Sequence, residues 1–103
     1  MPWYAFVTHF FAGMFLCNAL PHFVHGVSGE KFQSPFAKPP GVGLSSPRVN
    51  VLWGFGNVVV GAFLVEAWAE YPRELPDLIT IALGALVMGL MLANHFGKVK
   101  GNN

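Results

Sequence analysis

Three long stretches without a charged side chain constrain the fold of this chain more than any other feature. They run from residue 2 to 29, from 49 to 65 and from 78 to 97. A helix needs about 20 mostly apolar residues to cross the hydrocarbon core of a membrane. The sequence therefore predicts an all-α integral membrane protein with three transmembrane helices, near residues 3–25, 47–69 and 76–97.

The composition supports a membrane environment. Of the 103 residues, 53% are hydrophobic and only 11% are charged, whereas a water-soluble domain has about 25% charged residues. The length fits one domain, so residues 1–103 are predicted to form a single three-helix membrane domain. A net charge of +1 without a basic stripe argues against a nucleic-acid partner. The expected surroundings are the lipid bilayer.

Capping residues mark the ends of the predicted helices. Ser46 precedes Pro47, which is typical of an N-cap followed by proline at the first helical position. Asp77 falls in the first turn of the third helix, where a negative charge is favourable. Gly26 and Gly97 are expected to end the first and third helices.

A long Gly/Pro/Ser-rich connection joins the first two predicted helices, and its charge predicts the orientation. Five of the six Lys and Arg residues lie in or beside this connection or in the C-terminal tail. They are Lys31, Lys38, Arg48, Lys98 and Lys100. Basic residues favour the cytoplasmic side. We therefore expect a cytoplasmic loop and C-terminus and an external N-terminus, in a cell membrane such as the bacterial inner membrane.

Imidazole and carboxamide side chains gather near the loop end of all three predicted helices. The residues are Asn18, His22, His25, Asn50, Asn57, Asn94 and His95. Those of the first helix have i, i+4, i+7 spacing and so share one helix face. Polar residues at membrane depth are rare and are often functional. The pattern predicts a polar cluster that either binds a solute or hydrogen-bonds the helices to one another.

Small residues form stripes on the second and third predicted helices. Gly54 and Gly61 alternate with asparagines on the second helix, and Gly84 and Gly89 lie on the third. Such stripes permit close helix packing in membranes. They offer more packing surface than a three-helix core uses, so we expect a homo-oligomer or other membrane subunits as partners.

The sequence contains two further candidate binding sites. Ser45, Ser46 and Arg48 lie at a helix start, a pattern found in anion sites but also in ordinary N-caps. His22, His25 or His95 are candidate ligands for a metal or a haem iron. No third ligand or carboxylate is evident near these histidines, so no cofactor or metal is expected.

The acidic residues bear on catalysis. Four of the five lie around the second loop, where we expect them to be solvated and separated from the histidines. A Ser-His-Asp arrangement is then excluded, and no enzymatic activity is expected. His9, which lies farther outward, is expected to make a hydrogen-bonded helix contact.

The sequence favours an oligomeric or accessory membrane subunit without catalysis. One alternative is a small oligomeric transporter or channel for a polar or anionic solute, using the Asn/His cluster. A second alternative is a metal- or haem-binding electron-transfer subunit. No family motif is recognised in the chain.

Overall fold

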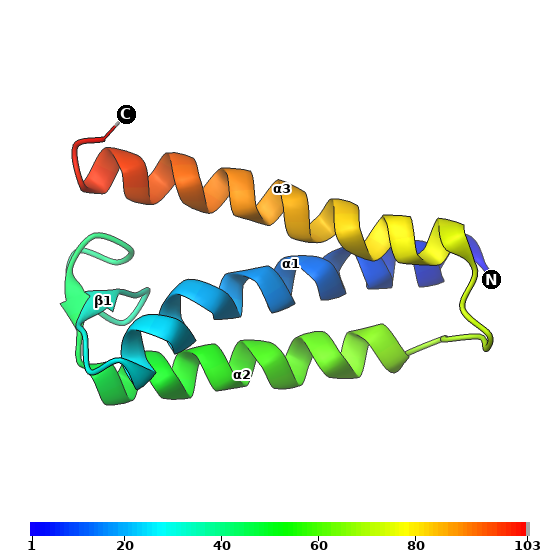
Figure 1. Cartoon of the computed structure of the whole chain (residues 1–103), viewed down its shortest axis with the longest axis horizontal. Helices are drawn as coiled ribbons and strands as arrows, with labels where there is room; N and C mark the ends of the chain where they lie inside the picture. Colours follow the sequence, from blue (N-terminus) through cyan, green and yellow to red (C-terminus); the bar gives the residue numbers. More distant parts are fainter. Residues whose placement is uncertain (103) are drawn as a thin grey trace.

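The computed structural model describes residues 1–102 and contains three long helices and one short hairpin (Figure 1). The helices are α1 (Trp3–Val27), α2 (Pro47–Glu66) and α3 (Leu75–Val99). Between α1 and α2, strand β1 (Phe32–Gln33) pairs antiparallel with β2 (Leu44–Ser45). All three helices are long and apolar enough to cross a membrane. The predicted three-helix architecture is confirmed, whereas the hairpin was not predicted.

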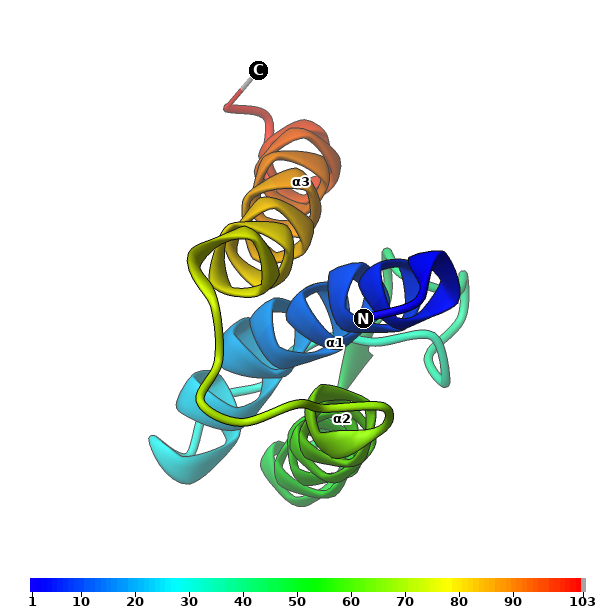
Figure 2. The same ribbon diagram turned by 90° about the vertical axis from the view of Figure 1, so that its right-hand side faces the viewer.

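Helix α1 lies between α2 and α3, as two perpendicular views show (Figures 1 and 2). It packs against both neighbours, and no packing of comparable extent joins α2 to α3 within residues 1–102. We call the end that holds residues 28–46 the loop end. The opposite end, with Met1 and the 67–74 connection, is the linker end.

The interior of the bundle is small and polar, and its surface is apolar. The buried apolar residues are Ala5, Ala12, Ala19 and Phe32. Large side chains point outward instead, as with Leu52, which is 71% exposed, and Phe63, which is 74% exposed. The buried polar residues are His9, His22, Gln33, Ser34, Asn50, Asn57 and Asp77. This distribution suits a lipid environment, where outward apolar groups are solvated and polar groups need internal partners.

Glycines bring α1 and α3 into backbone contact. A Cβ atom on Gly13 would lie 2.0 Å from the backbone oxygen of Ile81, and one on Gly84 would lie 1.9 Å from that of Phe10. No side chain fits in either gap. The two helices therefore touch directly, at a depth between the loop end and the linker end.

The glycines of α2 face α1. A Cβ atom on Gly54 would lie 2.7 Å from the backbone nitrogen of Phe23, and one on Gly61 would lie 2.7 Å from the Leu16 side chain. On α3, a Cβ atom on Gly89 would lie 3.5 Å from the sulfur of Cys17, again on α1. These glycines of the predicted stripes therefore face α1 of the same chain. The predicted homo-oligomer stays a prediction.

The C-terminal ends of all three helices differ from the prediction. The predicted caps at Gly26 and Gly97 are wrong, because α1 continues to Val27 and α3 to Val99. Gly26 is instead a contact point, since a Cβ atom there would lie 2.7 Å from the Pro47 carbonyl oxygen. The predicted start of α2 is confirmed: Ser46 is its N-cap.

Helix α2 ends at Glu66 rather than near residue 69. Trp68 has a φ of 62°, a left-handed conformation that does not continue a helix. The carbonyl groups of Val65 and Ala67 bind the side chains of Arg73 and His9. The His9 and Arg73 side chains therefore pair with carbonyl groups that backbone amides would pair with if the helix continued.

Candidate functional site

Asn50 fastens the loop to the helices at the loop end. Its Nδ2 donates hydrogen bonds to the carbonyl oxygens of Phe32 (3.1 Å), Ser45 (3.2 Å) and Ser46 (3.1 Å). Its Oδ1 lies 2.9 Å from Nδ1 of His22 on α1. Asn50 is fully buried, so one carboxamide joins β1, β2, α1 and α2.

A pair of carboxamides joins α1 to α2 nearer the middle of the helices. Asn18 donates from Nδ2 to Oδ1 of Asn57 at 3.0 Å. Asn57 donates from its own Nδ2 to the Trp53 carbonyl oxygen at 2.8 Å. Asn18, His22, Asn50 and Asn57 thus follow one another along the α1–α2 interface.

The other predicted polar residues do not join that interface. His25 stacks on Phe32 with ring centroids 4.3 Å apart, and its Nδ1 lies 3.2 Å from Glu30. His95 donates from Nε2 to the Gly41 carbonyl oxygen at 2.6 Å, while Asn94 is exposed on α3. In the described part of the chain, no three His, Cys, Asp or Glu side chains converge as metal ligands would.

The three residues of the predicted anion site do not act together. Ser45 Oγ lies 2.5 Å from Ser34 Oγ, and Ser46 Oγ accepts a hydrogen bond from the Val49 amide at 3.2 Å. Arg48 is exposed and pairs with none of residues 1–102. Both hydroxyl groups therefore serve the loop and the start of α2.

A pocket of about 180 Å³ lies at the loop end among these elements. This loop-side pocket is lined by Asn18, His22, Gln33, Ser34, Pro35, Gly41, Trp53, His95 and Phe96. All three helices and the loop contribute to it. Gln33 carries no sequence signal that would have marked it, since it is a single glutamine in a loop.

Two residues that line the loop-side pocket carry a buried polar atom without a hydrogen-bond partner in residues 1–102. These atoms are Oε1 of Gln33 and Nε1 of Trp53. Leaving such a group unpaired costs about 1–3 kcal/mol. Both atoms are buried in the wall of the pocket rather than exposed in it.

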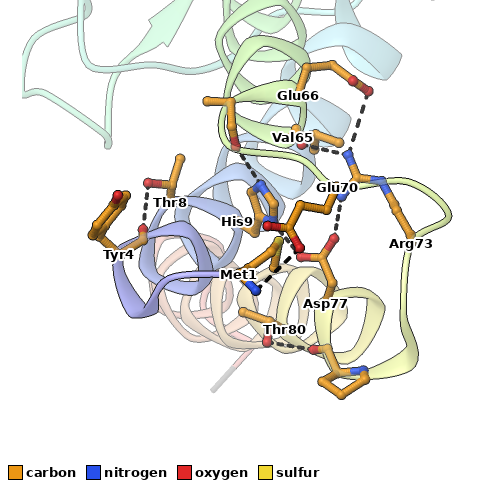
Figure 3. A network of polar contacts seen from close by, with 12 residues as sticks. Met1, Tyr4, Thr8, His9, Val65, Glu66, Glu70, Arg73, Asp77 and Thr80 are labelled. Carbon is orange, nitrogen blue, oxygen red and sulfur yellow. Dashed lines mark hydrogen bonds and ion pairs between the residues drawn. The ribbon is translucent and has the colours of Figure 1, made fainter.

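A second polar network lies at the linker end, where only solvated acids were expected (Figure 3). His9 Nδ1 contacts Oδ1 of Asp77, and His9 Nε2 lies 2.8 Å from the Ala67 carbonyl oxygen. His9 is fully buried, and Asp77 is 3% exposed. The expected separation of acids from histidines is therefore wrong, whereas the predicted hydrogen-bonded role of His9 is confirmed.

Arg73 completes this network. Its Nη1 donates to Oδ2 of Asp77 at 2.5 Å, and its Nη2 donates to the Val65 carbonyl oxygen at 2.6 Å. Glu66 lies 3.6 Å from Nη2, and the guanidinium group lies 5.2 Å from the centre of the Tyr71 ring. Burial lowers the pKa of Arg73, but hydrogen bonds to Tyr71 and Asp77 outweigh it and raise that pKa above its ordinary value.

The parallel course of α1 and α3 explains this arrangement. Both helices begin at the linker end, so His9 near the start of α1 and Asp77 near the start of α3 lie at the same depth.

No protein-family model matches the chain, and no curated protein or solved structure matches it. The geometry of the two polar sites is therefore the basis for a functional proposal.

Proposed function

We propose that this protein is a membrane-embedded binding protein that holds a small polar solute in the loop-side pocket. The observation that carries the proposal is a pocket of about 180 Å³ whose lining includes the polar side chains of Asn18, His22 and Gln33. Two buried atoms of its lining residues, Gln33 Oε1 and Trp53 Nε1, have no hydrogen-bond partner in residues 1–102. A solute that draws these groups into hydrogen bonds would relieve the cost of leaving them unpaired.

The proposed setting is a cell membrane, such as the bacterial inner membrane, crossed by all three helices. The loop end would face the cytoplasm, because Lys31, Lys38, Arg48, Lys98 and Lys100 gather there. At the linker end, Arg73 lies against Asp77 and Glu66, so its charge is largely balanced. The loop-side pocket would then take its solute from the cytoplasmic side.

Binding is a better proposal than passage through one chain. The backbones of α1 and α3 touch at Gly13 and Gly84, between the loop-side pocket and the linker end. On the other side of α1, Gly61 of α2 lies against Leu16. These contacts favour a pocket that is closed at its inner end.

The proposal is tested with purified protein in lipid nanodiscs and three small probes: acetamide, acetate and methylammonium. Saturable binding of at least one probe, measured by calorimetry, is expected for the wild-type protein. The Trp53→Phe variant should bind that probe more weakly, because it keeps an aromatic ring but loses the N–H group. Phe63→Leu, on the exposed surface of α2, is the matched control and should bind normally. If no probe binds saturably, the proposal is wrong.

A second candidate function is a non-catalytic accessory or oligomeric subunit. A hollow of about 270 Å³ between α2 and α3 is lined by Asn18, Asn57, Trp53, Phe11, Met14, Phe15 and Met88. Carboxamides at the floor of a membrane-facing hollow favour a further helix as cover. Native mass spectrometry from nanodiscs tests this, because a purely monomeric species would contradict a homo-oligomer.

A further inference from the structure

A second hollow at the loop end, of about 500 Å³, lies between α1 and α3. Its walls include Leu20, Val24 and His25 of α1, Gly89 and Leu92 of α3, and Lys100 directly after α3. We call it the α1–α3 groove, and it shares only Phe96 with the lining of the loop-side pocket. We propose that this groove binds one anionic phospholipid, with an acyl chain along its apolar floor and the phosphate group beside Lys100.

The divergence of α1 and α3 opens this groove. The two backbones touch at Gly13 and Gly84, and Figure 1 shows the helices separating from there toward the loop end. Further along α3, the nearest atom to a Cβ on Gly89 is the sulfur of Cys17, at 3.5 Å. A side-chain contact has thus replaced the backbone contact at this level. Because Gly89 has no side chain, the floor of the groove stays open there.

The walls of the groove are apolar over the depth of one membrane leaflet. Leu20 and Val24 are one helical turn apart on α1 and are exposed. Gly89 and Phe96 are two turns apart on the facing side of α3. From Gly89 to Lys100 the chain rises about 16 Å, and one leaflet of the hydrocarbon core is about 15 Å thick. An acyl chain therefore fits along the groove.

Lys100 places a positive charge at the outer end of the groove. It is the only Lys or Arg among the described lining residues, and none of them is Asp or Glu. Its Nζ lies 4.9 Å from the centre of the Phe32 ring, on which His25 also stacks. Glu30 pairs with His25, whereas Lys100 is exposed and forms no ion pair within residues 1–102. Its charge is therefore available to an anion from outside the chain.

An exposed cation beside an apolar groove fits an amphiphile better than a free anion or a further helix. A free anion would leave the apolar walls uncovered, and an apolar helix would leave the ammonium group without a counter-charge. A phospholipid supplies both parts, and basic pockets between transmembrane helices bind anionic headgroups. Lys31 and Lys98 are also exposed at the loop end and add to the positive charge there.

Native mass spectrometry of the purified protein in detergent tests the site with two lipids, dioleoylphosphatidylglycerol and dioleoylphosphatidylcholine. Their acyl chains are identical, but only the first lipid has a net negative charge. We expect the wild-type protein to bind one phosphatidylglycerol molecule about fivefold more tightly than phosphatidylcholine, which is the effect of one basic residue at an anionic lipid surface. Millimolar inorganic phosphate should not displace the lipid, because phosphate cannot cover the apolar walls.

Two pairs of variants locate the lipid. Lys100→Gln should remove the preference for phosphatidylglycerol, whereas Lys38→Gln, which removes the same charge from outside the groove lining, should keep it. Gly89→Leu should weaken the binding of both lipids roughly fourfold or more, because its side chain displaces at least about one buried methylene group of the lipid. Gly56→Leu should bind lipid normally, since no atom lies within 4 Å of its Cβ position.

Each contrary result overturns the proposed site. Equal affinity for the two lipids in the wild-type protein would contradict an anionic headgroup, and displacement by inorganic phosphate would indicate a free-anion site. An unchanged preference in Lys100→Gln, or unchanged lipid binding in Gly89→Leu, would place the lipid elsewhere. A dimer that persists at saturating phosphatidylglycerol would show that a second copy covers the groove. The comparison of the two lipids needs only wild-type protein, so it holds even where a variant misfolds.

Discussion

His9 and Asp77 are 68 residues apart in the chain, yet Nδ1 of His9 forms a buried contact with Oδ1 of Asp77 at the linker end. The second ring nitrogen of His9, Nε2, faces the Ala67 carbonyl oxygen at 2.8 Å. A carbonyl oxygen only accepts, so Nε2 carries a hydrogen. The imidazole therefore links three segments of the chain: α1, the 67–74 connection and α3.

Replacing His9 by leucine should destabilise the protein strongly. The substitution leaves the buried Asp77 carboxylate with Arg73 alone and leaves the Ala67 carbonyl group without its donor. Breaking a buried charged pair costs about 3–5 kcal/mol. We expect a decrease of this size in the free energy of unfolding of His9→Leu, measured by denaturant titration in detergent micelles.

The matched control is Glu30→Gln at the loop end. It removes the negative charge of the pair with His25, whose side chain is 33% exposed while that of Glu30 is 60% exposed. Exposed ion pairs contribute at most about 1 kcal/mol, so Glu30→Gln should change stability little. Equal losses in the two variants would contradict the assigned burial of the His9–Asp77 pair.

Arg73→Lys tests the two hydrogen bonds that the Arg73 guanidinium group donates at the linker end. Two separate guanidinium nitrogens reach Asp77 and the Val65 carbonyl oxygen, and a single ammonium group cannot reproduce both bonds. We expect a loss of about 1–3 kcal/mol in unfolding free energy. Similar unfolding curves for Arg73→Lys and the wild-type protein would show that these two hydrogen bonds do not stabilise the fold.

The pH dependence of the Arg73 contribution has a definite sign. The pKa of Arg73 is raised above its ordinary value, because its hydrogen bonds to Tyr71 and Asp77 outweigh the effect of burial. A cation with a raised pKa stabilises the fold below its unfolded-state pKa, and that contribution is lost only when the pH rises through the higher folded-state value. The difference between wild type and Arg73→Lys should therefore stay constant from about pH 5 to about pH 9. A difference that disappears within that range would show that another group carries the effect.

Asn50→Asp should release the loop from the helices. The substitution keeps the shape of the side chain but replaces the Nδ2 donor by an oxygen that faces three carbonyl groups. Backbone amides of residues 28–46 should then exchange with deuterium at least tenfold faster, as mass spectrometry would measure. Asn18→Asp is the control, because Asn18 bonds to α2 and not to the loop. Unchanged exchange in Asn50→Asp would remove Asn50 as the anchor of the loop.

Local patterns predicted the helices, but they did not predict the partners of their polar side chains. Hydropathy and length are properties of each segment alone, so the three spans and the cap at Ser46 follow from the sequence. The contact between His9 and Asp77 depends on how α1 and α3 are placed side by side. It could have been anticipated only by noting that both helices begin at the same end.

The candidate site shows the same limit. Asparagines and histidines at helical spacing are visible in the sequence, but their hydrogen bonds to the hairpin depend on a loop fold that Gly and Pro content does not specify. Gln33, which lines the loop-side pocket, lies in that loop. The stripe of Gly54 and Gly61 was correctly seen as a packing feature, but the sequence alone does not tell whether the partner helix belongs to the same chain.

The backbone contact between α1 and α3 is tested by three glycine substitutions of the same kind. Alanine is favoured over glycine inside a helix by about 1 kcal/mol, so Gly56→Ala should be neutral or stabilising, because no atom lies within 4 Å of its Cβ position. Gly13→Ala and Gly84→Ala place a methyl group 2.0 Å and 1.9 Å from backbone oxygens. The helices must separate, at a cost of about 1–3 kcal/mol. Thermal unfolding in nanodiscs should show lower midpoints for these two variants only. If all three variants behave alike, α1 and α3 do not touch there, and the closed inner end of the loop-side pocket loses its basis.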